Sequence, residues 1–369
     1  MKKIIATLPG DGIGPEVTAG AVEVLKDCAR AFGHQFDFRE LPFGGNAIDR
    51  CGEPLPPETL AGCKTADAVL LGAIGGPEWD SLPLGKRPEA GLLGIRQQMG
   101  LYINLRPIRP RPSLRGISPV RPDRIENCDF DIVRELAGDI YFGAHEFQRE
   151  QKDPSARDVA QYSASEITRV ARYAFERAAQ RKKHVTSVDK ANVLATSTLW
   201  RETVTAVGRE YPGITLDHLL VDNAAMQILL RPSQFDVMLT GNMFGDILSD
   251  EASALAGSIG LIPSMSRGEP NKPALYEPIH GSAPSIAGKD LACPLGAIYS
   301  AALMLSESFG LTEEAQWIDD AVNRVLEGGY RTADLAAPGD RLVSGSQFTA
   351  TIRGELRSKE PAGKAAPRS

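Results

Sequence analysis

Short apolar runs alternate with amphipathic stretches along most of this chain of 369 residues. Residues 3–10, KIIATLPG, have the length and apolar character of a buried strand. Residues 15–32 follow as a helix, because Pro15 suits a first helical position and apolar residues recur at helical spacing. Strands that alternate with helices usually form parallel sheets, so we expect an α/β fold with a largely parallel sheet and helices on both faces. Further strand-like runs are DAVLLGAIGG (67–76), HVTSVDK (184–190) and FDVMLTGN (235–242).

Composition limits the partners that the chain can have. With 42% hydrophobic residues it can bury a large core, and its length favours two domains or one elaborated α/β unit. The net charge is -6, and no lysine or arginine run is dense enough for a nucleic-acid or membrane-surface patch. No apolar run approaches the roughly 20 residues that cross a bilayer. Pro9 and the neighbouring glycines interrupt any signal-peptide core at the N-terminus. From the charge pattern and the short apolar runs we expect no nucleic-acid or membrane partner.

The five cysteines form an odd, scattered set without CxxC or Cys/His spacing. Such a set argues against a disulfide framework and against a zinc site, and it fits a protein of the reducing cytoplasm. The five are Cys28, Cys51, Cys63, Cys128 and Cys293.

Two segments depart from the α/β pattern. Residues 138–162 are polar and lack a helical stripe, so we expect a protruding hairpin or arm there. The tail, residues 355–369, is rich in proline, alanine and charge, which predicts disorder.

The string GDGIGPE (10–16) invites a dinucleotide-binding interpretation that its residues do not support. The Rossmann fingerprint needs a third glycine where this chain has Pro15, and it needs an acidic residue about 20 positions further on, after a second strand. The simpler interpretation is a tight turn from strand to helix that requires glycine dihedral angles.

Three aspartates and a lysine indicate a metal-assisted reaction. Asp246 and Asp250 are four residues apart in GNMFGDILSDEAS, so both carboxylates project from one face if the segment is helical and can share one hard cation. Asp222 follows an apolar strand, and Lys190 lies in DKANV. All-oxygen ligation suits Mg2+ or Mn2+ better than zinc. The structural alternative for Asp246 is a favourable charge at a helix N-terminus.

Three arginines complete this inventory. Forked guanidinium hydrogen bonds suit substrate carboxylates, although a surface salt bridge is the simple alternative for any one arginine. The set therefore indicates chemistry on a small dicarboxylic acid. The arginines are Arg96, Arg106 and Arg134.

The order of motifs along nearly the whole chain, from Ile4 to Ile352, is similar to that of the β-decarboxylating dehydrogenase family. Within the family, which also contains isocitrate, homoisocitrate and tartrate/malate dehydrogenases, the chain most resembles the 3-isopropylmalate dehydrogenases. That resemblance implies oxidation of a 2-hydroxy acid by a nicotinamide cofactor, with loss of the neighbouring carboxylate as CO2. The motifs are LPGDGIGPEV, GGPEWDSLP, RPEAGLL, LRP, VREL, IYFG, VDKANVL, TGNMFGDILSDEAS and HGSAP.

The resemblance also implies roles for these residues. Lys190 would take the hydroxyl proton and Tyr141 would protonate the carbon that loses CO2. Considered alone, Tyr141 would be a strand residue with a surface hydroxyl and Lys190 a solvated lysine. The implied metal ligands are Asp222, Asp246 and Asp250, and the implied carboxylate clamps are Arg96, Arg106 and Arg134.

Substrate choice in the family depends on the segment before Arg96. Isocitrate enzymes have serine and asparagine there to bind a third carboxylate, whereas this chain has Leu92 and Leu93, which with Val193 can surround an isopropyl group. Discrimination by a few methylenes is limited to about 1–3 kcal/mol, so another 3-alkylmalate or 3-benzylmalate of a specialised pathway stays an alternative to 3-isopropylmalate and leucine biosynthesis. The other implied substrate contacts are Glu89, Asn192 and Asp222.

The segment EPIHGSAPSIAGKDLACP resembles the cofactor-binding segment of the family, with two departures. Ser285 stands where aspartate usually holds the adenosine ribose, and Cys293 replaces a usual asparagine near the adenine. Ile286 is NAD-like, and the lysine-tyrosine pair of NADP-dependent relatives is absent, so we expect NAD. His280 resembles the residue that lies against the adenine. The implied cofactor contacts are Gly76, His280, Gly281, Ser282, Ala283, Pro284, Ser285, Ile286 and Cys293.

The family fold implies a discontinuous first domain that binds the cofactor, residues 1–101 and 257–369. A second domain, 102–256, would supply the dimer interface, with an arm at about 139–165. The resemblance implies a homodimer in which the lysine and the Asp222 equivalent reach into the partner's site. A non-catalytic regulatory homologue is the remaining alternative, and the retained Tyr141, Lys190 and three aspartates argue against it.

Overall fold

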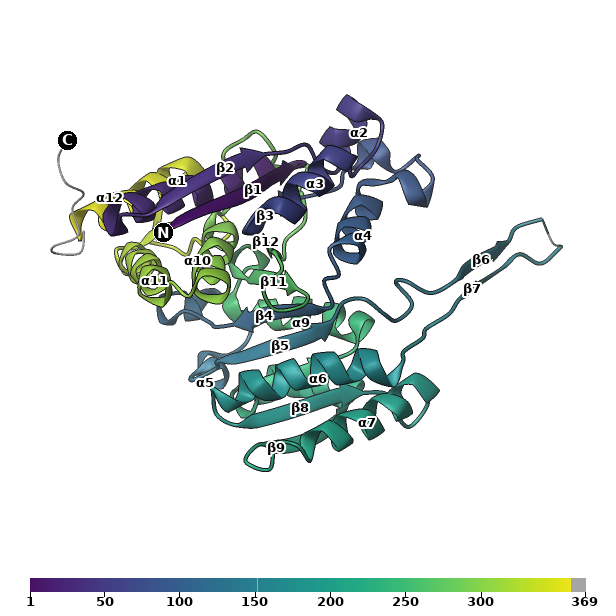
Figure 1. Ribbon diagram of the computed structural model, residues 1–369. Helices are drawn as coiled ribbons and strands as arrows, with labels where there is room; N and C mark the ends of the chain where they lie inside the picture. Colours follow the sequence, from purple (N-terminus) through teal and green to yellow (C-terminus); the bar gives the residue numbers. More distant parts are fainter. Residues whose placement is uncertain (151, 360–369) are drawn as a thin grey trace. The chain divides into compact units, whose positions relative to one another are not determined.

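The computed structural model describes residues 1–150 and 152–359, which form two compact units (Figure 1). The first unit contains Met1–Gly100, Arg111–Pro119 and the chain from Ala256 onward. The second contains Leu101–Pro110 and Val120–Leu255. None of the helices in the described part combines the length and apolar character that a membrane crossing needs.

The first unit is built on strands in the order β2-β1-β3-β12-β11. β1 pairs in parallel with β2 and β3, β3 pairs in parallel with β12, and only β11 runs antiparallel to its neighbour β12. Helices α1 and α10 pack on these strands, and α11 and α12 pack on those helices. Its strands are β1 (Lys2–Gly10), β2 (Gln35–Glu40), β3 (Ala68–Ala73), β11 (Pro263–Arg267), β12 (Ala274–Pro278), β13 (Tyr330–Arg331) and β14 (Arg341–Leu342). Its helices are α1 (Gly14–Phe32), α2 (Gly45–Cys51), α3 (Pro57–Thr65), α4 (Pro88–Gln98), α10 (Leu295–Phe309), α11 (Thr312–Glu327) and α12 (Gly345–Ser358), with short 3-10 helices η1 (Pro77–Trp79), η2 (Leu84–Lys86), η3 (Pro112–Ile117) and η5 (Ile259–Leu261).

The second unit has strands in the order β4-β5-β10-β8-β9. β4 and β5 are antiparallel, and the pairs β5/β10, β10/β8 and β8/β9 are parallel. Helix α6 packs on β5, β8 and β10, and α7 packs beside it. Its strands are β4 (Ile103–Ile108), β5 (Phe130–Glu135), β6 (His145–Gln148), β7 (Ser155–Asp158), β8 (His184–Asp189), β9 (Thr215–Leu220) and β10 (Val237–Thr240). Its helices are α5 (Pro122–Ile125), α6 (Ala164–Ala179), α7 (Ala195–Gly208), α8 (Val221–Leu230) and α9 (Asn242–Ala256), with the short η4 (Pro232–Gln234).

The structure confirms the α/β class and the elements predicted as β1, α1, β3, β8 and β10. The predicted disorder from residue 355 is wrong for its first residues, because α12 continues to Ser358. Leu356 is buried on the inner face of this helix, and Arg357 donates to Asp27 of α1, so tertiary packing outweighs the polar composition. Residues 360–369 lie outside the described part of the chain.

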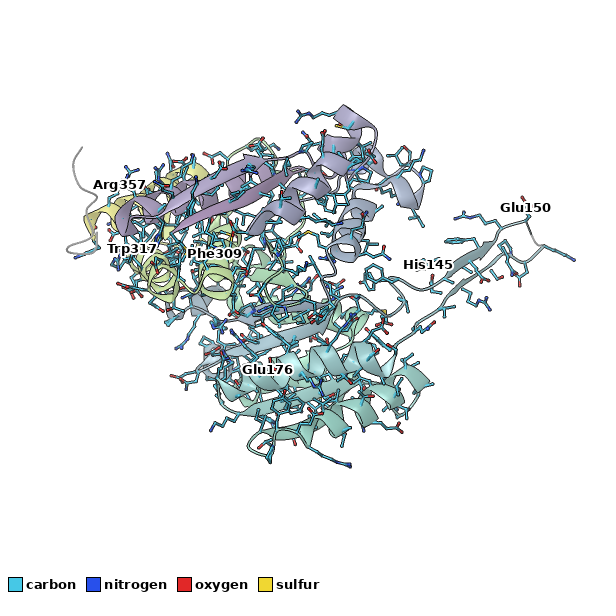
Figure 2. The ribbon with its side chains drawn as sticks, in the orientation of Figure 1. His145, Glu150, Glu176, Phe309, Trp317 and Arg357 are labelled. Atoms are coloured by element: carbon cyan, nitrogen blue, oxygen red, sulfur yellow. The ribbon has the colours of Figure 1, made fainter. Side chains whose placement is uncertain are left out.

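The predicted arm is an exposed antiparallel hairpin made of β6 and β7. Figure 1 shows it extending beyond the other strands and helices of the second unit. Every residue of both strands is exposed, including Phe147, and Figure 2 labels His145 and Glu150 on the hairpin.

A buried charge network supports the strands of the second unit. Asp131 of β5 is 0% exposed and accepts from Arg109 Nη2 at 2.9 Å and from Arg177 Nε at 2.7 Å. Arg181 lies 3.6 Å from the same carboxylate. Burial opposes ionisation, but the three guanidinium groups hold the pKa of Asp131 below its ordinary value of 3.8.

Asp131→Asn is expected to lower the free energy of unfolding by about 2–3 kcal/mol at pH 7, because three half-buried guanidinium groups lose their charged, buried acceptor. A carboxyl whose pKa is depressed in the folded state stabilises above its unfolded pKa, and that stabilisation is lost as the pH falls through the folded pKa. The difference between wild type and variant should therefore shrink below about pH 3.8. Urea denaturation over pH 3–7 measures it, and a difference that is constant with pH would contradict the role of this charge.

Candidate active site

Helix α9 presents the two aspartates that the sequence placed on one helical face. The buried strand β10 ends at Thr240, and after Gly241 the chain enters α9, where Asp246 and Asp250 lie one turn apart. Gly245 permits a close approach at this point, because a Cβ there would lie 2.3 Å from Thr240 Oγ1 and 2.6 Å from Arg134 Cγ. The predicted helical placement of the aspartate pair is confirmed.

Arg134 reaches Asp246 from the end of β5. Its Nε and Nη2 donate to Asn242 Oδ1 at 2.9 and 2.7 Å, and its Nη1 donates to Asp246 Oδ1. Asn242 is itself fixed, because its Nδ2 donates to Gly138 O at 3.0 Å. Since Arg134 is almost completely buried, its guanidinium is locked in one orientation toward the helix face.

Arg106 of β4 lies beside both aspartates of α9. Its Nη1 donates to Ser249 Oγ at 2.6 Å and to Asp250 Oδ1 at 3.3 Å, and its Nη2 is 3.5 Å from Asp246 Oδ1. Asn104 Oδ1 accepts from Nε at 2.9 Å and fixes the other side of the guanidinium. The contacts to the two aspartates are longer than those to Ser249 and Asn104, which fix the orientation of the guanidinium.

Tyr141 donates its hydroxyl to Asp246 Oδ2 at 2.6 Å, and the Arg134 guanidinium lies 5.5 Å from the centre of its ring. Burial, together with the hydrogen bond to Asp246, raises the pKa of Tyr141 to about 12. The phenol therefore keeps its proton at neutral pH and holds it beside the aspartate, as a proton donor must.

The aspartate pair has the chemistry of a site for a hard divalent cation. Burial raises the pKa of Asp250, and the neighbouring Asp246 charge acts in the same direction, while Arg106 opposes both. A divalent cation would relieve this repulsion, and the side chains facing it would all present oxygen. Among the described residues, no three His, Cys, Asp or Glu side chains lie close enough to hold a metal ion. A third carboxylate would thus have to come from elsewhere.

The predicted lysine and the predicted third aspartate pair with each other. Lys190 follows β8 and its Nζ donates to Asp222 Oδ1, in the first turn of α8, at 3.0 Å. This hydrogen bond lowers the pKa of Asp222. Asn192 and Val193 lie in the exposed turn after Lys190, where Val193 is 69% exposed.

The first unit places four candidate substrate contacts on one face of α4. Glu89, Leu92, Leu93 and Arg96 are spaced i, i+3, i+4 and i+7 on this helix. Arg96 is buried and donates to Glu277 Oε1 at 3.0 Å, while the two leucines are half-buried. The face therefore combines a cation for a carboxylate with an apolar surface for an alkyl group.

The HGSAP segment forms a tight loop in the first unit. His280 is buried, its Nδ1 contacts Gly281 O at 2.9 Å, and its Nε2 has no hydrogen-bond partner among the described residues. Burial lowers the pKa of His280, so the ring is neutral at physiological pH. Ala283 has a φ of 41°, in the left-handed region. A buried, neutral imidazole whose Nε2 lacks a hydrogen-bond partner among the described residues fits a site for a flat heterocycle such as adenine.

The remaining cofactor candidates differ in accessibility. Ser285 is exposed, and its carbonyl accepts from Lys289 Nζ at 2.9 Å. Cys293 is buried, and burial raises the pKa of its thiol to about 12, so it can contribute packing but not a reactive thiolate. Gly76 precedes η1 and lies so close to Trp79 that a Cβ would be 2.9 Å from its ring. The loop candidates are Gly281, Ser282, Ala283, Pro284 and Ile286, of which Ser282 is buried and Gly281 and Pro284 are exposed.

Sequence reasoning missed the residues that hold the arginines. Asn242 lies four residues before Asp246, and Ser249 is next to Asp250, so helical spacing from the aspartates could have identified both. Asn104 lies two residues before Arg106 on one strand, at the spacing of neighbours on one face. Glu277 is 181 residues from Arg96 and has no local signal.

Similarity to known proteins extends over nearly all of this chain. The family model described as isocitrate/isopropylmalate dehydrogenase matches residues 4–352. A 3-isopropylmalate dehydrogenase of Geobacillus kaustophilus is 55% identical over 350 residues, covering 95% of this chain and 94% of that protein. One of Bacillus subtilis is 52% identical over 361 residues, covering 97% and 98%.

Two solved structures are also similar to this chain over nearly its whole length. The crystal structure of isocitrate dehydrogenase from Methylococcus capsulatus has a TM-score of 0.86 at 33% identity and covers 96% of this chain and 99% of that chain. The apo β-decarboxylating dehydrogenase from Thermococcus kodakarensis has a TM-score of 0.78 at 37% identity, with 96% coverage of both chains. Matches of this length and identity, in a chain that keeps the arginine, aspartate and tyrosine cluster intact, show that it belongs to the isocitrate/isopropylmalate dehydrogenase family.

Proposed function

We propose that this dehydrogenase catalyses the NAD-dependent oxidative decarboxylation of 3-isopropylmalate in leucine biosynthesis, with Mg2+ or Mn2+ as its metal. The observation that carries the proposal is the convergence of Tyr141, Arg134 and Arg106 on Asp246. One cluster thereby combines a proton donor, two carboxylate-binding guanidinium groups and an anionic metal ligand. Relatives between 52% and 55% identical carry the name of this activity.

The residues divide the reaction into three tasks. Lys190 takes the proton of the C2 hydroxyl as the hydride leaves C2 for the nicotinamide, which gives a 2-keto acid. The carboxylate on the neighbouring carbon then leaves as CO2, and the electrons of the broken bond form an enolate. Tyr141 gives its phenolic proton to that carbon and completes the keto acid product. The buried guanidinium of Arg134, held by Asn242, orients a substrate carboxylate during these steps.

Asp246 and Asp250 would hold the metal together with Asp222. Arg106, which forms ion pairs with Asp246 and Asp250, would remain beside them. The bound cation would polarise the C2 oxygen and stabilise negative charge there. The donor set fits, because carboxylate oxygens are the ligands that Mg2+ and Mn2+ prefer.

Substrate identity is decided by turnover on related acids. Leu92 and Leu93 of α4 present an apolar surface for an isopropyl group, so 3-isopropylmalate should have the highest kcat/KM among 3-isopropylmalate, isocitrate, D-malate and 3-benzylmalate. NADH or NADPH formation at 340 nm measures it with either cofactor. Higher kcat/KM on 3-benzylmalate would favour a specialised pathway. Absence of turnover on all four acids would favour a non-catalytic homologue.

The proposed cofactor site lies in the first unit, on the loop from His280 to Ile286 with Gly76 and Cys293. The buried His280, whose Nε2 has no hydrogen-bond partner among the described residues, would help to hold the adenine of NAD, and the cofactor would supply hydride acceptance. The exposed hydroxyl of Ser285 would face the adenosine ribose.

Ser285→Asp is expected to lower the KM for NAD and to weaken the use of NADP. A carboxylate offers charged acceptors to the ribose hydroxyls, and a charge-assisted hydrogen bond is about twice as strong as a neutral one. The same charge repels a 2′-phosphate. Steady-state kcat/KM for both cofactors measures the effect, with Ser233→Asp, at an exposed serine of η4 in the second unit, as the control. An unchanged NAD-to-NADP ratio would mean that Ser285 does not face the ribose.

We further infer that the protein acts as a homodimer with shared sites. Met226, Leu229 and Leu230 of α8 and Ile247 of α9 are exposed apolar side chains, and Ile247 is 58% exposed. A second copy of the chain is the partner that would remove them from water. The Lys190–Asp222 pair then completes the aspartate cluster of the partner subunit, which supplies the missing third carboxylate. Light scattering should give the mass of two chains.

We also infer a cytoplasmic location, which the state of the thiols supports. All five cysteines are unpaired, and four of them are buried. Burial raises the pKa of the Cys28, Cys63 and Cys128 thiols to about 12, which keeps them inert as thiols. Free cysteines persist in a reducing compartment.

A further inference from the structure

The turn between β1 and α1 has no part in the proposed chemistry, yet it holds one buried carboxylate with several partners. Asp11 is 4% exposed. Its Oδ2 accepts the backbone N–H groups of Gly45 and Gly75, each at 2.8 Å, and its Oδ1 accepts that of Asn46 at 2.7 Å. One side chain therefore ties this turn to the N-terminus of α2 and to the loop after β3.

A glycine with positive φ stands beside the carboxylate in both segments. Gly44 has a φ of 73°, and a Cβ there would lie 2.6 Å from Asp11 Oδ2. Gly75 has a φ of 96°, which also favours glycine. The N–H groups of Gly45 and Asn46 belong to the first turn of α2 and have no acceptor within that helix, so Asp11 satisfies both of them as well as the N–H of Gly75.

The backbone of the same turn holds the HGSAP loop. Ile13 N donates to Ser282 O at 2.8 Å. Gly12 has a φ of 57°, and a Cβ there would lie 2.0 Å from that carbonyl oxygen. The turn thus packs against the loop that carries His280, and no larger residue than glycine fits between them.

Both segments held by the turn carry proposed cofactor contacts. Gly76 follows Gly75 directly, and Glu89 of α4 lies over Gly75, with its Oε1 3.0 Å from the position of a Cβ. We propose that Asp11 is a positioning residue for the nicotinamide cofactor, which fixes the Gly75–Gly76 segment against the turn that also carries the HGSAP loop. The inference rests on the proposed function, which assigns Gly76 and the loop of His280 to NAD.

The test measures cofactor binding apart from turnover. Asp11→Asn keeps the size of the side chain but turns an NH2 group toward a backbone N–H donor. The Kd for NADH, from fluorescence titration of the full-length protein without substrate, and the KM for NAD are expected to rise about tenfold or more. The kcat at saturating NAD should change far less, because the carboxylate touches no reacting atom.

Asp27→Asn is the matched control. Asp27 is another buried aspartate of the first unit, 2% exposed, and it accepts from Arg353 Nε at 2.6 Å. This variant should lower Tm without changing the Kd for NADH. If Asp11→Asn does not fold, Asp11→Ser carries the test, since its smaller side chain admits water to the three N–H groups.

Two outcomes would overturn the inference, and they are distinguishable. A folded Asp11 variant that binds NADH as tightly as Asp27→Asn removes the positioning role and leaves the proposed function intact. Wild-type protein that binds neither NADH nor NADPH removes the proposed function and the inference together.

Discussion

Replacing Lys190 by methionine is expected to lower kcat by about 10²–10⁴-fold, the usual cost of removing a positioned proton-transfer group. Methionine has a similar length but cannot exchange a proton. Within residues 1–150 and 152–359, the Nζ of Lys190 donates one hydrogen bond, to the exposed carboxylate of Asp222, so its loss removes little folding free energy. Steady-state formation of NADH with 3-isopropylmalate measures kcat, and light scattering checks that the variant remains a dimer.

Lys182→Met is the matched control for this variant. Lys182 precedes β8, whereas Lys190 follows its other end. Lys182 Nζ donates to the carbonyl oxygen of Asp129 at 2.9 Å. Its replacement should leave kcat close to that of the wild type. A Lys190→Met enzyme that is as active as Lys182→Met would contradict the role of Lys190 as the base.

A buried strand of the fold can be predicted from the sequence where it is a continuous apolar run. The run at β3 is buried at every position, and its apolar residues identify it. β2 and β9 lack such a run, because each lies at the end of its unit's strand order and is largely exposed or half-exposed. They form strands by pairing with the buried neighbours β1 and β8, which local sequence does not reveal.

The candidate site likewise contains residues that local sequence predicts and residues that it does not predict. The four-residue spacing of Asp246 and Asp250 is local, so helical geometry alone placed them on one face. Tyr141 meets Asp246 across 105 residues of sequence, and only the resemblance to a known family indicated that they act together. The proposed positioning role of Asp11 has no local signal, because GDGIGP is explained equally well as a tight turn. Its partners Gly45, Asn46 and Gly75 are distant in sequence and are known only from the structure.

Asp246→Asn is expected to lower turnover by about 10³-fold, because metal stabilisation of developing charge is worth several kcal/mol. Asp246 also accepts from Tyr141 and Arg134, so an amide there loses a charged acceptor as well as a ligand. In the wild type, chelation with EDTA should abolish turnover, and Mg2+ or Mn2+ should restore it. Full activity of the variant in metal-free buffer would rule out the metal assignment.

Glu251→Gln controls for the loss of an acidic group from α9. Glu251 follows Asp250 on the same helix and is offset by about 100° from it, so its side chain leaves the face of the aspartate pair. Burial raises the pKa of Glu251, but no proposed contact with metal or substrate involves this residue. The variant should keep both kcat and the concentration of Mg2+ needed for half-maximal activity.

Mixing two inactive variants tests whether the sites are shared. In a dimer of Lys190→Met with Asp246→Asn chains, a shared arrangement gives one site with both residues intact and one site with neither. Random pairing makes half of the dimers mixed, so co-expressed variants should recover about one quarter of wild-type turnover. If Lys190 instead served the Asp246 of its own chain, every site in the mixture would lack one of the two residues. Turnover no higher than that of the separate variants, in a sample shown by mass spectrometry to contain mixed dimers, would therefore refute the shared site.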